Sequence, residues 1–549
     1  MLMADMGSRD ENPGSNRKFR LMAFLPGNGP ANSRGHNARA RVRFPDRFTL
    51  GLTVSFFGID LFNILHHEMW RDELQAWMIA RGSSSIFDLV RNIRYEGHPA
   101  VWFLLLHAIT RFTTWAPAMQ LLNLAIATGT AYLIAAYSPF TKLQKALLCF
   151  SYFPLYEYGT ISRNYGIGLF FLFWFCASYH PDRKQNLIIP AVLLSLLANT
   201  SVYGTMIALA FAVSLFAFPA IAAQDTRGFL ALRATHVRAA ALIFFLCTAL
   251  AIAQMHPPPD SGFATGWPLS ARGLGETLTA VWTAFLPIPS SLSHFWNTNF
   301  LWQNSALTGQ WSKLAWAITR LGSAIILLIA LILLARKRFA LLAYASATAA
   351  LLTFAHVKYR GFERHVGHLF LVFVACLWIA ARCPEESFAF PLLERGSRLL
   401  AGQRSKILTC LLCVQFAVAV NASRVDWARP FSQGKSVAAF LRSNGMADMF
   451  VVGDADDCVS TIAGYLGRGI YYTRSQSIGS FIVWNQSRLQ PPPNLIETAT
   501  NIATLRKEEV LIISSVPLVI GTRSVHKVAE FTGSIAEEDF YVYRVDPGQ

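Results

Sequence analysis

The chain has 549 residues, of which 53% are hydrophobic and only 15% are charged. Soluble domains carry about 25% charged residues, so the composition excludes a large soluble enzyme, and it also excludes fibrous, disordered and disulfide-stapled proteins. The formal charge of +16 would suit nucleic acid, but the Lys and Arg residues fall largely in the N-terminal tail and in short loops between apolar runs. That distribution is typical of an oriented membrane protein and argues against a nucleic-acid partner.

Residues 1–47 contain nine Lys/Arg and four Asp/Glu among scattered Gly, Asn, Ser and Pro. We expect a disordered basic tail held in the cytoplasm. The first apolar run, Phe48 to Leu65, begins too deep in the chain for a cleaved secretory signal and is expected to be an uncleaved anchor. The polar loop 67–98 then lies outside the cytoplasm.

Further apolar runs predict a mainly α, polytopic membrane domain over residues 48–420. They lie near 99–114, 118–138, 143–158, 165–180, 187–201, 203–222, 236–255, 313–335, 339–356, 366–381 and 406–420, with 276–288 as a weaker candidate. Basic loops near 227–238, 336–338 and 395–404 read as cytoplasmic, which places the loop 256–312, the turn 357–365 and the tail 421–549 outside. Twelve spans would put both ends on one side, whereas this charge pattern requires an odd number. We therefore expect 11 or 13 spans, with the error in 99–180 or at 276–288.

Residues 421–549 have the composition of a small α/β domain on the outer, periplasmic side. The segments MFVVGDAD, GIYYTRS, EVLIISSVPLVI and DFYVYRV predict short strands, and Ser436–Asn444 and Cys458–Leu466 have helical spacing. No GxxxxGK[ST] loop and no GxGxxG after a strand occurs, so nucleotide-driven chemistry has no support in the sequence.

The stretch after the first span, HHEMWRDELQAWMIA, carries adjacent acids at Asp72 and Glu73. Acids beside a spanning helix are costly unless they are solvated, paired or used. The apolar spacing predicts two short amphipathic helices lying flat in the interface, with Trp70 and Trp77 at headgroup depth. A purely structural interpretation stays open, in which Asp72 is a helix N-cap and Gln75 completes a capping box.

The motifs WRDELQAWMIA, YEGHPAVWFLLL and FPLYEYGTISRNYGIG, with the later KYRGFERHVGHL, resemble GT-C glycosyltransferases. More narrowly, they resemble the protein-mannosyltransferase and aminoarabinose-transferase-like group, similar to glycosyltransferase family 39. The resemblance is anchored in residues 60–180. It implies transfer of a sugar from a polyprenyl-phosphate carrier to a lipid, polysaccharide or protein acceptor on the outer face of the membrane. The layout resembles bacterial members, which implies the inner membrane.

By this resemblance, Asp72 matches the first acid of the family's pair and would be the general base that takes a proton from the acceptor. Partial burial is expected to raise the pKa of Asp72 towards neutrality. Glu73 would orient the acceptor or steady a cation. His98, before Pro99, and Asp60, on the polar face of the first helix, either line the cavity or have a structural role.

The departing phosphate gains charge and requires cations, for which arginine is well suited. Arg163, followed by Tyr165, resembles the family's Ser-Arg-x-x-Tyr-like turn, although an ordinary positive loop residue would look the same. A second basic cluster is predicted to lie outside, against the usual loop bias, and this favours a phosphate or headgroup partner. Its members are Lys358, Arg360, Arg364 and His365.

No cofactor is required by the sequence. A divalent ion held by Asp72 with His66, His67 and Glu68 stays open, although these residues lack a regular ligand spacing. The CxxC at Cys410 lies in an apolar segment without a second ligand pair. The rival function is a transporter or flippase for lipid-linked glycans. The two are distinguished by whether Asp72 and Arg163 share one cavity.

Overall fold

The computed structural model describes residues 45–180, 186–222, 235–263, 271–387, 391–454, 456–521 and 523–547. From Asp46 onward the chain forms one compact unit. The expected N-terminal tail, except for its last three residues, lies outside the described residues.

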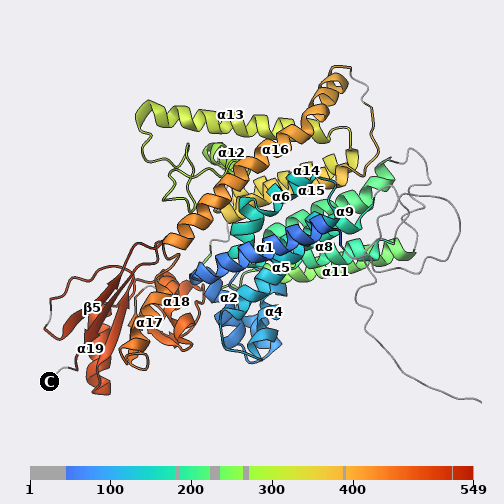
Figure 1. Ribbon diagram of the computed structural model, residues 1–549. Coiled ribbons are helices and arrows are strands. Elements are labelled where there is room, and N and C mark those ends of the chain that lie inside the picture. Colours follow the sequence, from blue (N-terminus) through green and yellow to red (C-terminus); the bar gives the residue numbers. More distant parts are fainter. Residues whose placement is uncertain are drawn as a thin grey trace, which may run out of the picture. The chain divides into compact units, whose positions relative to one another are not determined.

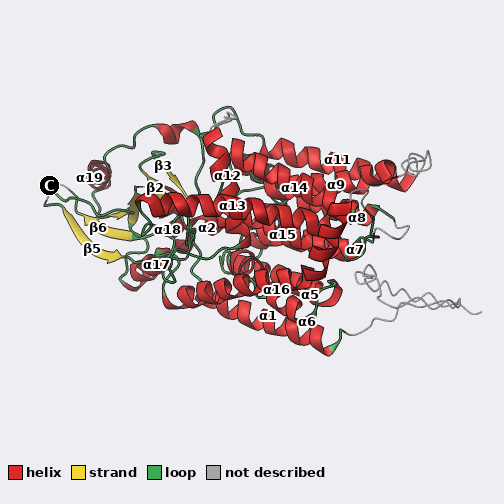
Figure 2. Cartoon of the chain, turned by 90° about the horizontal axis from the view of Figure 1, so that it is seen from above, coloured by secondary structure: helices red, strands yellow, loops and turns green. Residues whose placement is uncertain are grey.

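The chain is a polytopic membrane protein, as its composition predicts. Seven of the described helices are long and apolar enough to cross a bilayer. They are α1 (Arg47–His66), α5 (Ala118–Tyr137), α11 (Thr235–Met255), α13 (Gly309–Leu334), α14 (Arg338–Val357), α15 (Glu363–Ala380) and α16 (Pro391–Ala428). Three shorter apolar helices accompany them: α4 (Val101–Thr110), α7 (Asn164–Ser178) and α8 (Ile188–Ala198). A further helix, α9 (Val202–Ala222), is apolar over Val202–Phe216. Figures 1 and 2 show most of these helices side by side in one bundle.

The region 99–180 departs from the predicted spans. Helix α4 has 10 residues and is only about 15 Å long, half of a hydrocarbon core of about 30 Å. The run predicted at 143–158 is divided into α6 (Lys142–Cys149) and a buried π-helix, η1 (Tyr152–Thr160). Neither α4 nor α6 is long enough to cross a bilayer alone. The weaker candidate at 276–288 belongs to a helix, α12 (Ala271–Phe285).

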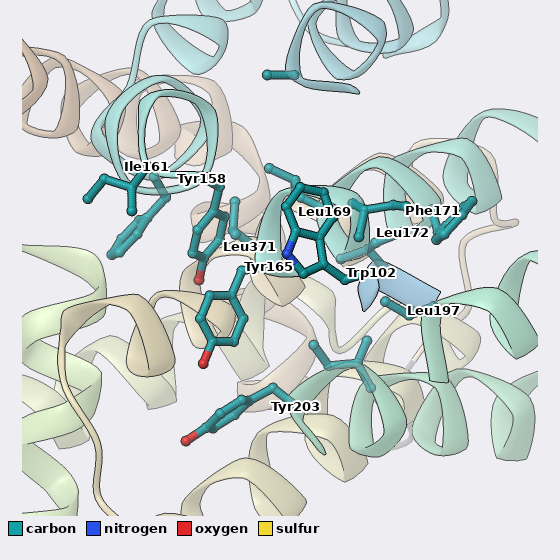
Figure 3. Packing of buried hydrophobic residues seen from close by; sticks show 14 of the residues in the cluster. Trp102, Tyr158, Ile161, Tyr165, Leu169, Phe171, Leu172, Leu197, Tyr203 and Leu371 are labelled. Atoms are coloured by element: carbon teal, nitrogen blue, oxygen red, sulfur yellow. The ribbon is translucent and has the colours of Figure 1, made fainter. Parts of the chain in front are cut away.

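Close packing explains why η1 and α15 lie at the centre of the bundle. A Cβ on Gly159 would lie 3.2 Å from the carboxylate of Asp60 on α1, and one on Gly367 would lie 2.3 Å from the ring of Phe153 on η1. Every residue of α15 is buried. Figure 3 shows the rings of Tyr158, Tyr165 and Tyr203 in succession within this packed interior.

The two helices predicted in the loop 67–98 are confirmed as α2 (Arg71–Gly82) and α3 (Ile86–Ile93). Helix α3 buries Leu89 and exposes Phe87, as an amphipathic helix should. Trp70 and Trp77 are both buried within the protein, and their place at headgroup depth stays a prediction. Asp72 is not the N-cap of α2.

The C-terminal region forms a six-stranded sheet, as an α/β composition predicts, at one end of the helices (Figure 2). Its strands are β1 (Phe450–Gly453), β2 (Ile470–Tyr472), β3 (Ser477–Gly479), β4 (Val510–Ser514), β5 (Val525–Phe531) and β6 (Phe540–Val545). The order is β3-β2-β1-β4-β6-β5, with β1 parallel to β2 and β4 and the remaining pairs antiparallel. Its helices are α17 (Gly434–Ser443), α18 (Asp456–Leu466) and α19 (Leu495–Arg506), with a short 3-10 turn, η2 (Gln486–Leu489).

Alternating side chains give the sheet two apolar faces. Val451, Leu511 and Ile513 join the large core that includes α18, whereas Val452 and Ile512 pack with α19. Helix α18 then packs against α2 (Figure 1), where a Cβ on Gly464 would lie 3.1 Å from the side chain of Leu74. The C-terminal region therefore rests directly on the helix that carries Asp72.

Candidate active site

A cavity of about 470 Å³ lies where α2, the turn before α7, the start of α15 and the loop after α12 meet the C-terminal region. Polar and aromatic side chains dominate its lining. The lining residues are Trp70, Arg71, Asp72, Gln75, Glu96, Arg163, His294, Trp296, Asn297, Thr298, Phe362, Arg364, Asp457, Ile482, Trp484, Ile535, Ala536 and Glu537.

Asp72, Arg163 and Arg364 form a cluster of charges in this cavity. Oδ2 of Asp72 accepts from Nη2 of Arg364 at 3.1 Å and is ion-paired with Nη1 of Arg163. The two arginine side chains are only 11% and 10% exposed. Nε and Nη1 of Arg364 are buried and have no hydrogen-bond partner among the described residues. The sequence predicted that Asp72 faces Arg163 and the basic cluster at 358–365. The structure places Arg163 beside Asp72 and, from that cluster, Arg364.

The expectation that burial raises the pKa of Asp72 is wrong. Burial alone would raise it, but the charges of Arg163, Arg364 and Arg71 together outweigh burial and lower the pKa of Asp72 to about 2. Asp72 is therefore an anion that offsets the charge of the two arginines.

Glu73 turns away from the cavity and holds the site together from behind. Its Oε1 accepts from the backbone N–H of Ser162 at 2.7 Å, next to Arg163. Its Oε2 accepts from the N–H of Trp70 at 3.3 Å, which makes Glu73 the capping residue of α2, and pairs with Nε2 of His67 at 3.0 Å. Glu73 is therefore a positioning residue. Of the two roles predicted for it, steadying a cation fits its pairing with His67, and orienting the acceptor stays a prediction.

His67 is the cation of this buried network. Its Nδ1 lies 2.8 Å from Oδ2 of Asp426 on α16. Burial would lower the pKa of His67, but Asp426 and Glu73 outweigh it and raise the pKa to about 10. A protonated imidazole thus ties α16 to α2.

Three other predicted residues lie behind the arginines without lining the cavity. The guanidinium of Arg163 lies 5.7 Å from the ring centre of Tyr165, whose hydroxyl has no partner among the described residues. His98 packs edge-on against Tyr165, and burial, aided by Arg163, lowers its pKa to about 3. His365 also packs edge-on against Tyr165 and stacks on Tyr203. This group supports the arginine pair through packing.

The remaining predicted residues lie outside the cavity lining. Lys358 is at the end of α14. Arg360 stacks over Trp302 at 3.8 Å, and burial lowers its pKa to about 10. Asp60 is buried in α1, where it accepts from the hydroxyl of Thr160 at 3.1 Å. Of the two roles considered for Asp60, the structural one fits this position.

Sequence reasoning missed a second carboxyl group in the cavity. Glu96, within the motif YEGHP, accepts from Nε2 of Gln75 at 2.8 Å. Burial raises the pKa of Glu96 to about 7, against the opposing effects of Gln75 and Arg163. Its place before the Gly-His-Pro turn was the only available signal.

Aromatic side chains also line the cavity. Trp70 and Trp296 meet edge to face, with ring centres 5.8 Å apart, and Trp484 comes from the C-terminal region. Among the described residues, no group of three His, Cys, Asp or Glu side chains is arranged to hold a metal ion. His67 of the metal set considered above is instead engaged by Asp426 and Glu73.

Comparison with known proteins finds no matching family model and no matching curated protein. Among solved structures, the chain is similar to ArnT from Cupriavidus metallidurans, solved bound to undecaprenyl phosphate, at 11% identity and a TM-score of 0.47, covering 90% of this chain and 98% of that one. It is also similar to the arabinofuranosyltransferase AftD from Mycobacteria at 12% identity and a TM-score of 0.33, covering 90% of this chain and 40% of that one.

Proposed function

We propose that the protein is a membrane glycosyltransferase that moves a sugar from a polyprenyl-phosphate carrier to an acceptor hydroxyl or amine on the outer face of a bacterial inner membrane. The observation that carries the proposal is the pair of buried arginines, Arg163 and Arg364, beside Asp72 in one cavity. A bound phosphate would accept hydrogen bonds from Nε and Nη1 of Arg364, which have no partner among the described residues. The likeness to ArnT, solved with undecaprenyl phosphate, names the carrier chemistry to test first.

In the proposed reaction, the acceptor oxygen attacks the anomeric carbon as the bond from that carbon to the phosphate oxygen breaks. The bonding electrons leave with the phosphate, whose growing charge Arg163 and Arg364 stabilise. The acceptor proton passes to a carboxylate of the cavity. Because the displacement is direct, the anomeric configuration inverts.

Asp72 is the proposed base. Its pKa is low because Arg163 and Arg364 both pair with its carboxylate. A donor phosphate that binds the same arginines adds a negative charge beside Asp72, which raises its pKa as a base requires. Glu96, with its pKa already near 7, is the second carboxylate that could accept the proton.

The test measures polyprenyl phosphate released when purified protein meets a panel of polyprenyl-phosphate sugars and a membrane extract. Wild type is compared with Asp72→Asn, Glu96→Gln and, as a matched carboxylate control away from the cavity, Glu530→Gln. We expect release by wild type and by the control, and its loss in Asp72→Asn. The assay is run with and without a chelator, which tests the open proposal of a divalent ion.

Each other outcome is informative. Loss in Glu96→Gln with retention in Asp72→Asn would transfer the role of base to Glu96. Absence of release with every donor, in protein shown to be folded, would contradict the transferase and favour the transporter of lipid-linked glycans.

A further inference from the structure

The C-terminal region supplies part of the cavity wall. Asp457 comes from the first turn of α18, Trp484 from the segment after β3, and Glu537 from the turn before β6. The cavity therefore has a cationic side, where Arg163 and Arg364 lie, and a second side with an indole and two carboxylates. The proposed donor accounts for the first side only.

Two residues of the cavity lining have a positive φ. Four described residues other than glycine do so: Asn297, Gln476, Lys507 and Glu537. Lys507 ends α19 in the usual left-handed cap, and Gln476 and Glu537 (φ 58°) lie in the loops of the β2–β3 and β5–β6 hairpins. Asn297 (φ 54°) lies in a turn, where asparagine adopts this conformation readily. Asn297 and Glu537 both line the cavity, so two turns contribute to its wall.

Trp484 is held from several directions. The guanidinium of Arg488 lies 4.2 Å from its ring centre, and Phe263 packs 5.8 Å away. Its backbone oxygen accepts from the N–H of Gly262 at 2.9 Å. The ring is nevertheless only partly buried and contributes to the cavity wall. A fixed, half-exposed indole offers an apolar surface at little entropic cost on binding.

The carboxylates define what the indole would hold. Asp457 lies 3.8 Å from Nη1 of Arg71 and 3.7 Å from Nη2 of Arg488, two arginines that also pair with Glu538 and Asp456. Carboxylate oxygens that still have free lone pairs are acceptors for hydroxyl donors. An indole beside acceptor oxygens suits a ring that is apolar on one face and rich in hydroxyls at its edge.

We propose that the C-terminal wall formed by Asp457, Trp484 and Glu537 is the acceptor subsite, and that the acceptor is a carbohydrate. This inference rests on the proposed function of the same cavity and names the substrate class that the function leaves open. The sugar ring lies against Trp484, and its hydroxyls donate to Asp457 and Glu537.

The experiment measures equilibrium binding to the full chain by calorimetry, without any donor. The probes are mannotetraose, arabinotetraose, tetragalacturonate, tetralysine and a Ser/Thr tetrapeptide. Variants are Trp484→Ala, Glu537→Gln and Glu537→Gly, with Glu530→Gln as the control. We expect at least one saccharide to bind, about tenfold more weakly to Trp484→Ala and Glu537→Gln and unchanged to the control, which corresponds to one lost hydrogen bond or ring contact.

Glu537→Gly separates binding from folding. Glycine adopts a positive φ without strain, so this variant should unfold at a temperature no lower than wild type and still bind saccharide more weakly. Wild-type affinity in Glu537→Gly and Trp484→Ala would overturn the proposal, as would preferred binding of tetralysine or the peptide, or no binding of any saccharide. Undecaprenyl phosphate binding is measured in parallel and should be unchanged in these variants. Its absence in wild type would count against the donor, not against the acceptor wall.

Discussion

Replacing Asp72 by Asn should tighten the binding of undecaprenyl phosphate while abolishing turnover. The carboxylate of Asp72 is paired with Arg163 and Arg364, the two arginines that a phosphate would bind. A phosphate bound across Arg364 would lie roughly 6 Å from the carboxylate, where two unit charges at an effective dielectric constant of 20 repel by about 3 kcal/mol. Removing this repulsion strengthens phosphate binding by roughly ten- to hundredfold, allowing for solvent screening.

The assay is a titration of undecaprenyl phosphate into wild type, Asp72→Asn and Asp457→Asn. The last variant is a control, because it makes the same change of charge on the part of the cavity wall that the C-terminal region supplies. Only Asp72→Asn should bind more tightly. An unchanged or weaker affinity in Asp72→Asn would refute the idea that Asp72 and phosphate compete for the arginines. Equal tightening in Asp457→Asn would mean that net charge alone decides the affinity.

Three further perturbations test other contacts of the site. Glu96 ionises as the pH rises through about 7, and its charge should weaken undecaprenyl phosphate binding several-fold between pH 6 and 8.5, against the strengthening expected as the phosphate takes its second charge. Glu96→Gln should therefore bind undecaprenyl phosphate more tightly than wild type at pH 8.5 and equally at pH 6. Identical profiles of affinity against pH would contradict the shifted pKa. Glu73→Gln places an amide donor against protonated His67 and should cost about 3 kcal/mol of stability, seen as a lower unfolding temperature in detergent, and a wild-type temperature would show that the buried pair is not needed. Gly464→Leu drives a side chain into Leu74 and should lower turnover by more than about tenfold, although Gly464 lies in the C-terminal region. Gly464→Ala should lower turnover less. Unchanged turnover in Gly464→Leu would show that the contact of α18 with α2 is not required.

Sequence reasoning was most successful where one segment determines its own structure. Alternating and apolar runs predicted β1, β2, β4 and β6, which are largely buried. It missed β5, an edge strand with mostly exposed side chains, and β3, which has three residues. A short or exposed strand has no hydrophobic pattern to detect.

The site was predicted by residue type and misread in its electrostatics. Asp72, Arg163 and Arg364 were named, but they are far apart in the sequence, and only their contact shows that the arginines outweigh burial. The same limit hid the role of Glu73, whose partners His67 and Ser162 lie on separate elements. Glu537 belongs to no motif at all.

The contact of α18 with α2 has a consequence for recombining this protein with others. The backbone N–H of Arg71, one residue before the proposed base, donates to Glu538 at 3.1 Å, and the hydroxyl of Tyr465 donates to the backbone oxygen of Met69 at 3.0 Å. A chimaera joined after α16 would therefore exchange part of the support of Asp72 along with the acceptor wall. Replacing the C-terminal region of this membrane protein by that of another would require α2 to be transferred with it. The loop that carries α2 and the C-terminal region then behave as one exchangeable unit.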